Sequence, residues 1–541
     1  MDAKQLKEVG DNLFSKKLSL NSLHQEIAEN FYVERADFTV TRSMGSDFAS
    51  NLMSSYPLLC RRDLGNHFGA MLRPTAKPWF HVARRHTQDE NNETRRWLQY
   101  FEDVQRRAMY DSDSLFMRAT KEADHDFAAF GQCALSVEMN SKNDALLYRC
   151  WHLRDMAWQE NQDGKIGAVF RRWKPGARVL ARTFPGKVSQ KVNDIAAKTP
   201  FAEQEVMHMV VEADMYDGDA KGRPWWSIWY DITNACEIEC TPIWSRYYVI
   251  PRWQTVSGSQ YAYSPATVAA LPDARLIQAM TFTLLEAGEK ATNPPMIATQ
   301  DAVRSDIAVF AGGVTWVDME YDERSGEALR PIAQDLRGFQ YGLKMNEDSR
   351  AMIHRAFYLN AMTLPERASG MSEYEIGERV NEYVRGALPL FEPMEQEYNA
   401  ALCEATFDLL WRNGAFGSPL SWPKSMRGAD IEFKFESPLH DAIEQGKASK
   451  LTQAIQLTSA VAPVDPSVAR VLDAKAALRD ALYGIGIRAT WMRSEEQVSE
   501  EEAKAQAEQQ AAKLLAGLES GTKSAANLAG AQRDIAQAQA A

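Results

Sequence analysis

The sequence lacks the features by which several large classes of protein are recognised. It has only 6 cysteines in 541 residues, and they show neither the spacing of zinc ligands nor the density of a disulfide framework. We therefore expect buried free thiols. No run of about 18 apolar residues exists, so we expect no membrane span. Residues 1–20 lack the apolar stretch of a signal peptide, so the protein is expected to stay where it is made.

An excess of basic residues is also missing. Lys and Arg number 61 against 73 Asp and Glu, which gives a net charge of −12. Proteins that hold nucleic acid tightly usually carry a basic surface, because neutralised phosphates supply most of the affinity. The balance argues against such tight binding, although mild acidity is common in cytoplasmic proteins and decides little alone.

Recognisable catalytic motifs are absent too. The 9 histidines form no His-Glu-x-x-His, and no Gly-x-Ser-x-Gly elbow occurs. Residues 517–524 approach a phosphate-binding loop, but Thr522 separates Gly521 from Lys523, and a helix break in an Ala-rich tail explains them better. Residues 124–126 (Asp-His-Asp) point to different faces of a helix, which favours a solvated face over a metal or acid–base cluster. We predict no catalytic residue, cofactor or metal.

What the sequence contains is an ordinary globular composition, 45% hydrophobic and 25% charged, in a chain long enough for several cores. Ten of the 14 tryptophans precede residue 264, so the largest core should lie there. The pattern predicts an α+β protein that is mostly helical. In the first half it predicts helices at residues 18–32, 46–72 and 94–130, and strands at residues 132–139, 145–150, 166–173, 206–212 and 243–250.

The middle of the chain is predicted to form two long helices separated by a segment that contains strand-like runs. Apolar positions recur at helical spacing over residues 265–293, with Pro272 as a kink or first turn, and consecutive prolines end the helix. Residues 313–318 and 328–332 suggest a small β-hairpin, and a second helix covers residues 339–360. Such a pair exposes apolar stripes that neighbouring copies can cover, and a repeated contact that closes makes a ring.

The last third of the sequence is predicted to contain a loop, a long helix, a strand, further helices and a tail. Residues 361–372 form a short polar loop. Ser372 and Glu375 then form a capping box, which starts a long helix that ends before Asn413. Residues 431–435 alternate like a strand, helices follow, and residues 495–541 are rich in Ala, Gln and Glu, which is typical of a helical or disordered tail.

Short motifs occur in a fixed order along most of the chain. The central ones are Pro251-Arg252-Trp253, Ser257-Gly258-Ser259-Gln260-Tyr261, Ser264-Pro265, Leu271-Pro272-Asp273 and Asn293-Pro294-Pro295. Others are residues 64–74, Trp79-Phe80, residues 124–131, residues 371–376, Ser437-Pro438-Leu439 and residues 484–487. Together they resemble the head-to-tail connector (portal) proteins of short-tailed, T7-like bacteriophages. Two departures, at Ala262-Tyr263 and at residues 372–376, mean that roles tied to those side chains do not carry over.

The resemblance implies a portal fold with a wing, a helical stem, a small β-containing clip and a C-terminal helical crown. The implied boundaries are wing 1–264, first stem helix 265–293, clip 294–338, second stem helix 339–360, tunnel loop 361–372, long wing helix and return strand 373–435, crown 436–494 and tail 495–541. Sliding of DNA through such a channel would suit a wall that is not basic.

The implied function is that of a non-enzymatic portal subunit, in a dodecameric ring at one capsid vertex of the virion, assembled in the host cytoplasm. Double-stranded DNA would be packaged and ejected through the ring. The implied partners are terminase, tail adaptor, scaffolding, capsid and internal core proteins. Another ring-forming virion protein, such as a tail adaptor, is the alternative, and a nuclease or ATPase comes third.

Three groups of candidate site residues follow from the resemblance. The tunnel loop would present Met362, Thr363, Glu366, Arg367 and Ser369 to the channel, although an ordinary surface turn with a solvated Arg367 is equally compatible with the sequence. Possible channel charges are Lys290, Lys344 and Arg350. Exposed helix charges usually pair, so we favour the competing role for them, in salt bridges between subunits with Glu286, Glu289, Glu347 or Asp348. Candidate clip contacts are Arg304, Trp316 and Arg324.

Overall fold

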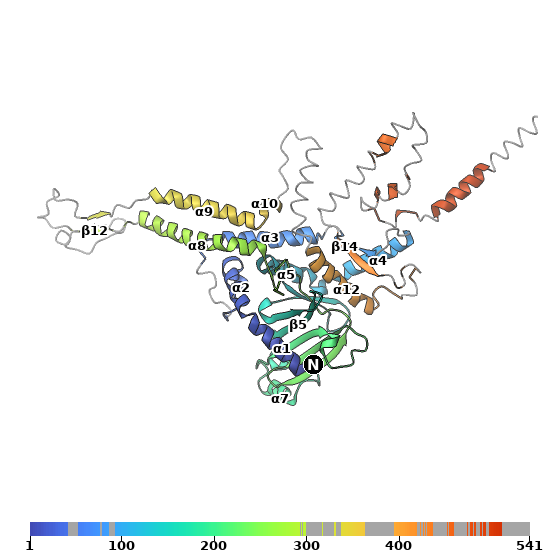
Figure 1. Cartoon of the computed structure of the whole chain (residues 1–541), viewed down its shortest axis with the longest axis horizontal. Helices are drawn as coiled ribbons and strands as arrows, with labels where there is room; N and C mark the ends of the chain where they lie inside the picture. Colours follow the sequence, from blue (N-terminus) through green and yellow to red (C-terminus); the bar gives the residue numbers. More distant parts are fainter. Residues whose placement is uncertain are drawn as a thin grey trace, which may run out of the picture. The chain divides into compact units, whose positions relative to one another are not determined.

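Figure 1 shows a computed structural model of the chain. It describes residues 1–41, 52–75, 78–85, 92–292, 337–362, 394–418 and 430–435, together with short pieces at 294, 296–298, 316, 329–331, 422–423, 426, 428, 452, 454–458, 473, 477–479, 481–482, 487–488, 491–493 and 497–510. The chain divides into two compact units. Unit 1 comprises residues 1–79 and 107–413, and unit 2 comprises residues 80–106 and 414–541.

The centre of unit 1 is a five-stranded antiparallel sheet whose strands follow one another in chain order. Helix α1 (Ala3–Lys16) packs on one face, where Leu6 and Phe14 join Phe170 and Met207 in a buried cluster. Asp2 caps this helix with a complete capping box. The strands are β4 (Met156–Glu160), β5 (Ile166–Trp173), β6 (Val206–Glu212), β7 (Trp225–Asp231) and β8 (Cys236–Ile243).

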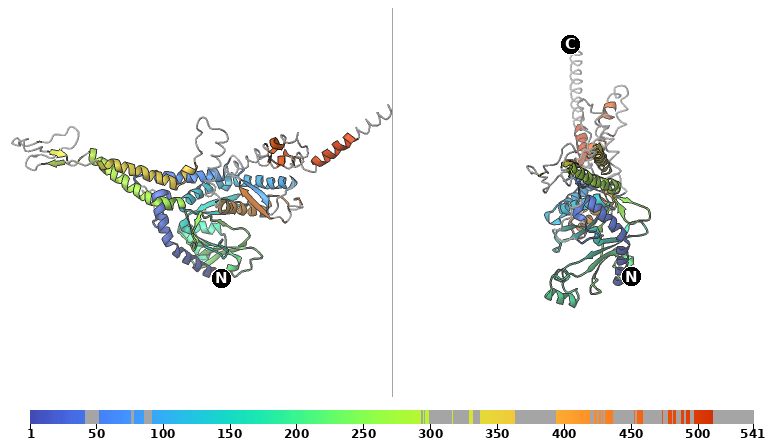
Figure 2. Two further views of the ribbon diagram at one scale, coloured as in Figure 1. Left: turned by 45° about the horizontal axis from the view of Figure 1, so that its top comes forward. Right: turned by 90° about the vertical axis from the view of Figure 1, so that its left-hand side faces the viewer.

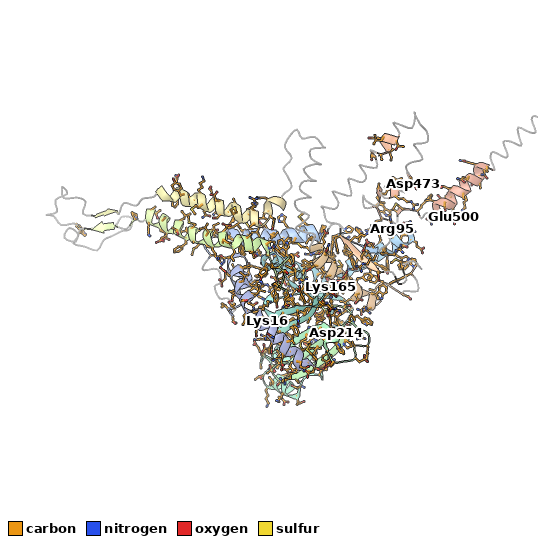
Figure 3. All side chains as sticks on the ribbon, viewed as in Figure 1. Lys16, Arg95, Lys165, Asp214, Asp473 and Glu500 are labelled. Carbon is orange, nitrogen blue, oxygen red and sulfur yellow. The ribbon has the colours of Figure 1, made fainter. Side chains whose placement is uncertain are left out.

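Two short helices, α6 (Ala177–Thr183) and α7 (Gln190–Lys198), cover one end of the other sheet face. Their inner residues Leu180, Phe184 and Val192 pack against Val206 and Ile238. Alternate side chains of a strand point to opposite faces, which is why Val206 and Met207 serve different clusters. Figure 3 labels Lys16 at the end of α1 and Asp214 after β6.

A second sheet of three strands has the order β3-β2-β9. Helices α5, α3 and α2 pack beside it, and the rings of Phe68 and Phe127 meet edge to face at 5.9 Å. These elements are β2 (Ala134–Met139), β3 (Leu146–Trp151), β9 (Tyr248–Val249), α2 (Leu18–Phe31), α3 (Tyr56–Leu72) and α5 (Phe116–Phe130). The α+β class predicted from sequence is confirmed.

The predicted outgoing and returning helices are present as α8 (Pro265–Thr292) and α9 (Arg337–Ala356), which lie side by side (Figures 1 and 2). We call this pair the α8–α9 hairpin. Pro272 lies inside α8. Helix α9 ends earlier than predicted, because Tyr358 adopts φ 57° before the short helix α10 (Leu359–Met362). Strand β13 (Leu329–Pro331) falls in the predicted β-hairpin, but its partner is β12 (Met296–Ala298).

Unit 2 contains strand β1 (Phe80–Arg84) paired with β14 (Ile431–Phe435), which confirms the predicted strand at residues 431–435. Most of helix α4 (Asn92–Met109) belongs to this unit, and Phe101 packs at 5.0 Å from both Phe416 and Trp422. None of the helices in the described ranges is both long and apolar enough to cross a membrane.

Three sequence predictions for the first half were wrong. The helix expected over residues 46–72 does not include residues 52–55, because α3 begins at Tyr56. The single helix expected over residues 94–130 is interrupted after Met109 by a 3-10 turn and by Leu115, which takes φ 55° and starts α5. The strand expected over residues 243–250 is reduced to β9, because Ile243 already ends β8.

The predicted long helix starting at residue 373 lies outside the described residues up to 393. Its described end is a π-helical segment, Glu395–Ala400, followed by α12 (Ala401–Arg412), and it stops before Asn413 as expected. The crown and tail fall almost entirely outside the described residues, apart from short pieces such as the helical stretch 497–510.

Candidate functional site: the α8–α9 hairpin and its anchors

The inner face of the α8–α9 hairpin combines small, polar and apolar side chains. A Cβ atom on Gly342 would lie 2.9 Å from Leu284 Cδ2, so glycine is what allows this close approach. Asn346 Nδ2 donates a hydrogen bond to Thr281 Oγ1 at 3.2 Å, and Asn346 is buried. Ile353 is fully buried nearer the base of the hairpin. The two helices therefore hold a fixed alignment through a few specific contacts.

The outer face of the hairpin is apolar and exposed. On α8, Val268, Leu276 and Phe282 are exposed within a sector roughly 120° wide that faces away from the buried Ile277, and Phe282 is 55% exposed. On α9, Tyr341, Met345 and Met352 share one face. Single exposed apolar residues are common on proteins, but aligned stripes on two adjacent helices mark an interaction surface.

The base of the hairpin is fixed to the end of α5. Ser264 Oγ donates to the carbonyl of Ala128, and Thr267 Oγ1 donates to that of Ala129, both at 2.8 Å. All four residues are buried. Buried hydroxyls that satisfy the last carbonyls of a helix set the direction in which the next helix leaves. The hairpin is thus a continuation of the packed unit, not a loosely tethered arm.

A second anchor lies further along α8. Arg275 pairs with Glu26 on α2, with Nη2 2.5 Å from the carboxylate. The neighbouring Gln278 binds the backbone of Met53 and Ser54 just before α3. Contacts on two separate elements resist bending of α8 where it leaves the body of the unit.

Comparison with known proteins identifies the family of this chain. Residues 3–492 match the family described as "Bacteriophage head to tail connecting protein". The chain belongs to that family. It is 23% identical over 469 residues to the "Probable portal protein" of Bordetella phage BPP-1, covering 83% of this chain and 82% of the relative. It is 22% identical over 484 residues to the "Portal protein" of Salmonella phage epsilon15, covering 85% and 83%.

Solved structures are less similar to this chain than these relatives are. A chain in the virion of a native gene transfer agent (GTA) particle aligns with a TM-score of 0.32 and 11% identity, covering 81% of this chain and 95% of that one. A chain from the neck of an empty GTA particle aligns with a TM-score of 0.33 and 12% identity, covering 73% and 84%. The family match and the portal relatives confirm the predicted portal resemblance, and they support a portal role over the tail-adaptor alternative.

The predicted channel charges of the connecting protein lie on α8 and α9. Lys290 Nζ lies 2.7 Å from Glu286 Oε1 on the same helix, and its role at the channel or between subunits stays a prediction. Lys344 is exposed and has no ion pair within the described ranges. The guanidinium of Arg350 lies 5.7 Å from the ring centroid of Tyr56. Whether Lys344 and Arg350 also serve other subunits stays a prediction.

Most of the other predicted site residues lie outside the described residues. This applies to Thr363, Glu366, Arg367 and Ser369 of the tunnel loop and to Arg304 and Arg324 of the clip. Met362 is the last residue of α10, and Trp316 is 71% exposed. Their predicted roles therefore stay predictions.

Sequence reasoning missed the buried charges of unit 1. Residues 124–126 are not a solvated face, because Asp124 and Asp126 are almost fully buried. Asp124 pairs with Arg73, and Asp126 pairs with Arg35 at 2.7 Å. The carboxylate of Asp124 holds the pKa of Arg73 above its usual value. The sequence offered one signal for this pair: Arg73 and Asp124 both lie in motifs that carry the family resemblance, residues 64–74 and residues 124–131.

The π-helical segment joins these buried charges to a second ionic cluster. Arg73 Nη1 donates to Asn399 Oδ1 at 2.8 Å. Two residues earlier, Glu397 Oε2 accepts from the backbone and side chain of Arg252 at 3.1 and 3.3 Å. Arg252 also pairs with Glu160. A π turn widens the helix, which lets neighbouring residues face different partners.

One buried network looks like catalytic machinery but is enclosed. His208 bonds to Ser227 Oγ at 2.9 Å and to Tyr248 Oη at 2.6 Å, and its ring stacks on Trp229. His208 has no exposed surface, and burial lowers its pKa well below the usual value. A substrate has no access to either ring nitrogen of His208. The network instead connects the five-stranded sheet, through Ser227, to the three-stranded sheet, through Tyr248.

Metal and thiol chemistry give no further candidate. Across the described part of the chain, no group of three or more His, Cys, Asp or Glu residues could hold a metal ion. All six cysteines lie in the described ranges and none forms a disulfide; Cys60, Cys133 and Cys403 are buried and the other three are partly buried. Burial raises the pKa of Cys133 well above its usual value, which keeps this thiol protonated.

Proposed function

We propose that copies of this chain form a closed ring in which the α8–α9 hairpins stand side by side around a channel for double-stranded DNA. The observation that carries the proposal is the apolar outer face of the hairpin, where Leu276 and Phe282 on α8 and Tyr341 on α9 are exposed in the single chain. A neighbouring copy that covers this face would remove apolar area from water. A contact of this kind, repeated from copy to copy with a rotation that returns to the first copy, closes into a ring.

The proposed ring is dodecameric and stands at one vertex of the capsid. Membership of the connecting-protein family and similarity to two proteins named as portals support this placement. DNA would enter during packaging and leave during ejection. Terminase and then tail adaptors would dock at residues 294–338, while other parts meet capsid, scaffolding or internal core proteins. Assembly would take place in the host cytoplasm, and the mechanism would be geometric and electrostatic, without a covalent step.

The proposed channel wall includes the tunnel loop that contains Arg367. Lys344 and Arg350 on α9 are six residues apart and face different sides of that helix, so only one of them would join the same wall. One positive side chain per copy becomes a belt of charge in a ring, which attracts the phosphate backbone without reading sequence. The total charge of −12 limits this attraction, so that DNA slides. Deleting residues 362–370 should leave rings intact but impair the filling or retention of DNA.

Substitutions on the outer face of α8 test the ring. Leu276→Asp or Phe282→Asp should abolish rings in negative-stain images, because each puts a charge into the covered contact. The thermal midpoint of the remaining protomer should change by no more than about 2 °C, since both side chains are exposed in the single chain. Val256→Asp is the control, at a site that is 53% exposed and lies outside the hairpin.

Intact rings in both α8 variants would refute the proposed contact. Leu284 is a poor test residue, because it packs against Gly342 inside the hairpin and its replacement would disturb folding as well as assembly. Protomers that turn over ATP or cleave DNA without forming rings would favour the enzyme alternative.

A further inference from the structure

The lobe formed by residues 174–201, which contains α6 and α7, has a charge opposite to that of the whole chain. It holds six basic side chains and one acid, a net charge of +5 in a chain whose total is −12. The six are exposed: Lys174, Arg178, Arg182, Lys187, Lys191 and Lys198. We call this segment the basic lobe.

Almost all of these cations lack an internal partner. Lys187 pairs with Glu239 at 2.8 Å, and the other five form no ion pair in the part of the chain that the structure describes. Arg178 and Arg182 are four residues apart on α6 and share one face, an arrangement of like charges that costs helix stability. The core of the lobe is instead formed by buried apolar residues such as Leu180 and Val192.

The basic lobe also displays an aromatic ring on a fixed turn. Phe201 is 88% exposed, and Val179 on α6 is 53% exposed. The backbone around Phe201 is held by hydrogen bonds from Ala177 N to Ala202 O at 2.8 Å and from Arg178 N to Pro200 O at 3.1 Å. A side chain presented by an already ordered backbone loses little entropy when it binds.

We propose that the basic lobe docks an acidic segment of another protein of the particle. Interfaces between proteins are enriched in aromatic residues and arginine, which is the combination of Phe201 with Arg178 and Arg182. The positive charge of the lobe complements an acidic segment and would speed its association. A DNA backbone is the less suitable occupant, because phosphates are bound through charge and hydrogen bonds and make no use of the exposed apolar surface of Phe201 and Val179.

A second copy of this chain is also less suitable, on an argument that rests on the proposed ring. In Figures 1 and 2, α7 lies at the end of unit 1 away from α8 and α9. Copies that meet through their α8–α9 hairpins around an axis diverge as the distance from that axis grows. The basic lobe would then be far from the next copy and open to other components.

Site-specific crosslinking in assembled particles tests the docking. Phe201 is replaced by the photoreactive p-benzoylphenylalanine in the full chain, particles are irradiated, and crosslinked peptides are sequenced by mass spectrometry. We expect the major product to join Phe201 to a net-acidic peptide of a different polypeptide. The control carries the same group at Val256, outside the lobe, and should not give that product. Adding Arg178→Glu and Arg182→Glu should lower the yield at least about fivefold.

The remaining outcomes separate failure of this inference from failure of the ring. Crosslinks to DNA or to another copy of this chain would overturn it, as would a yield no higher than at Val256. Loss of rings in the Phe201 variant alone would also overturn it, because the lobe would then be a contact between copies. Absence of rings in the unsubstituted chain would instead refute the proposed function.

Discussion

The side-chain amide of Gln278 makes both backbone hydrogen bonds of Ser54. Its Oε1 accepts from Ser54 N at 2.8 Å, and its Nε2 donates to Ser54 O at 2.9 Å. Oε1 also accepts from Met53 N at 2.7 Å. One side chain on α8 thus takes the place of a strand partner for the segment that leads into α3.

Gln278→Leu should release that segment. The two amides and the carbonyl of Met53 and Ser54 would lose their partners, at a cost of about 1–3 kcal/mol. Hydrogen exchange measured by mass spectrometry should show faster exchange at residues 53–54 and unchanged exchange in β6. Gln278→Glu keeps the acceptor but not the donor and should give an intermediate rate. Full protection of Ser54 in Gln278→Leu would contradict this role.

Gly131 and Gly164 form a matched pair for backbone strain. Both have positive φ, 71° and 72°. A Cβ on Gly131 would lie 2.0 Å from the carbonyl carbon of Tyr263, whereas nothing lies within 4 Å at Gly164. Gly164→Ala should cost about 1–2 kcal/mol for the left-handed backbone alone. Gly131→Ala should cost more than about 3 kcal/mol or prevent folding. Urea midpoints measure both, and equal losses would contradict the predicted clash.

The buried Arg73–Asp124 pair predicts a large loss when one partner is removed. Asp124→Ala leaves the Arg73 charge uncompensated in the core and should cost about 3–5 kcal/mol. Glu122→Ala, on the same helix, removes an exposed pair with Arg118 and should cost under about 0.5 kcal/mol. The double variant Arg73→Met with Asp124→Leu should recover part of the loss. Similar unfolding midpoints for Asp124→Ala and Glu122→Ala would show that the pair contributes little.

Lys17 predicts an unusual dependence of stability on pH. Its Nζ donates to the carbonyls of Leu153 and Met156 at 2.6 and 2.8 Å, and burial lowers its pKa to about 7 from the ordinary value of 10.5. Between these values the unfolded chain binds more protons than the folded one, so the free energy of unfolding rises with pH. Below about pH 7 the folded protein bears the full cost of a buried charge.

Lys17→Met isolates this effect. The free energy of unfolding of the natural protein minus that of the variant should increase between about pH 7 and pH 10, by at most about 1.4 kcal/mol per pH unit. It should be flat below that interval. Thiols and phenols titrate in the same range, but they are present in both proteins and cancel in the difference. Parallel curves would mean that Lys17 is not buried in its neutral form.

Local signals were enough to predict the hairpin helices. Pro265 starts α8 and Asn293 lies one residue beyond its end, so both limits are marked in the sequence by residues that restrict the backbone. Of the predicted strands that became β2, β3, β5 and β6, β3 has one face more buried than the other. The other three are buried on both faces along most of their length, and short runs of apolar residues mark them in the sequence.

Other elements carry no such signal. Strand β7 has almost every side chain buried and so does not alternate. The break at Leu115 is marked by neither Gly nor Pro. The contact of Arg73 with Asn399 joins residues 326 positions apart, which no local pattern reveals. The exposure of Phe201 likewise depends on how a loop is pinned, not on its composition.

The pairing of Phe80 with Phe435 across β1 and β14 has a consequence for synthesis on the ribosome. The five-stranded sheet is built from sequential hairpins and can form soon after residue 243 emerges from the exit tunnel. Strand β1 is made much earlier but must wait, with its edge unpaired, until β14 has been translated. Unit 2 should therefore mature last, and nascent chains should depend on chaperones during that interval.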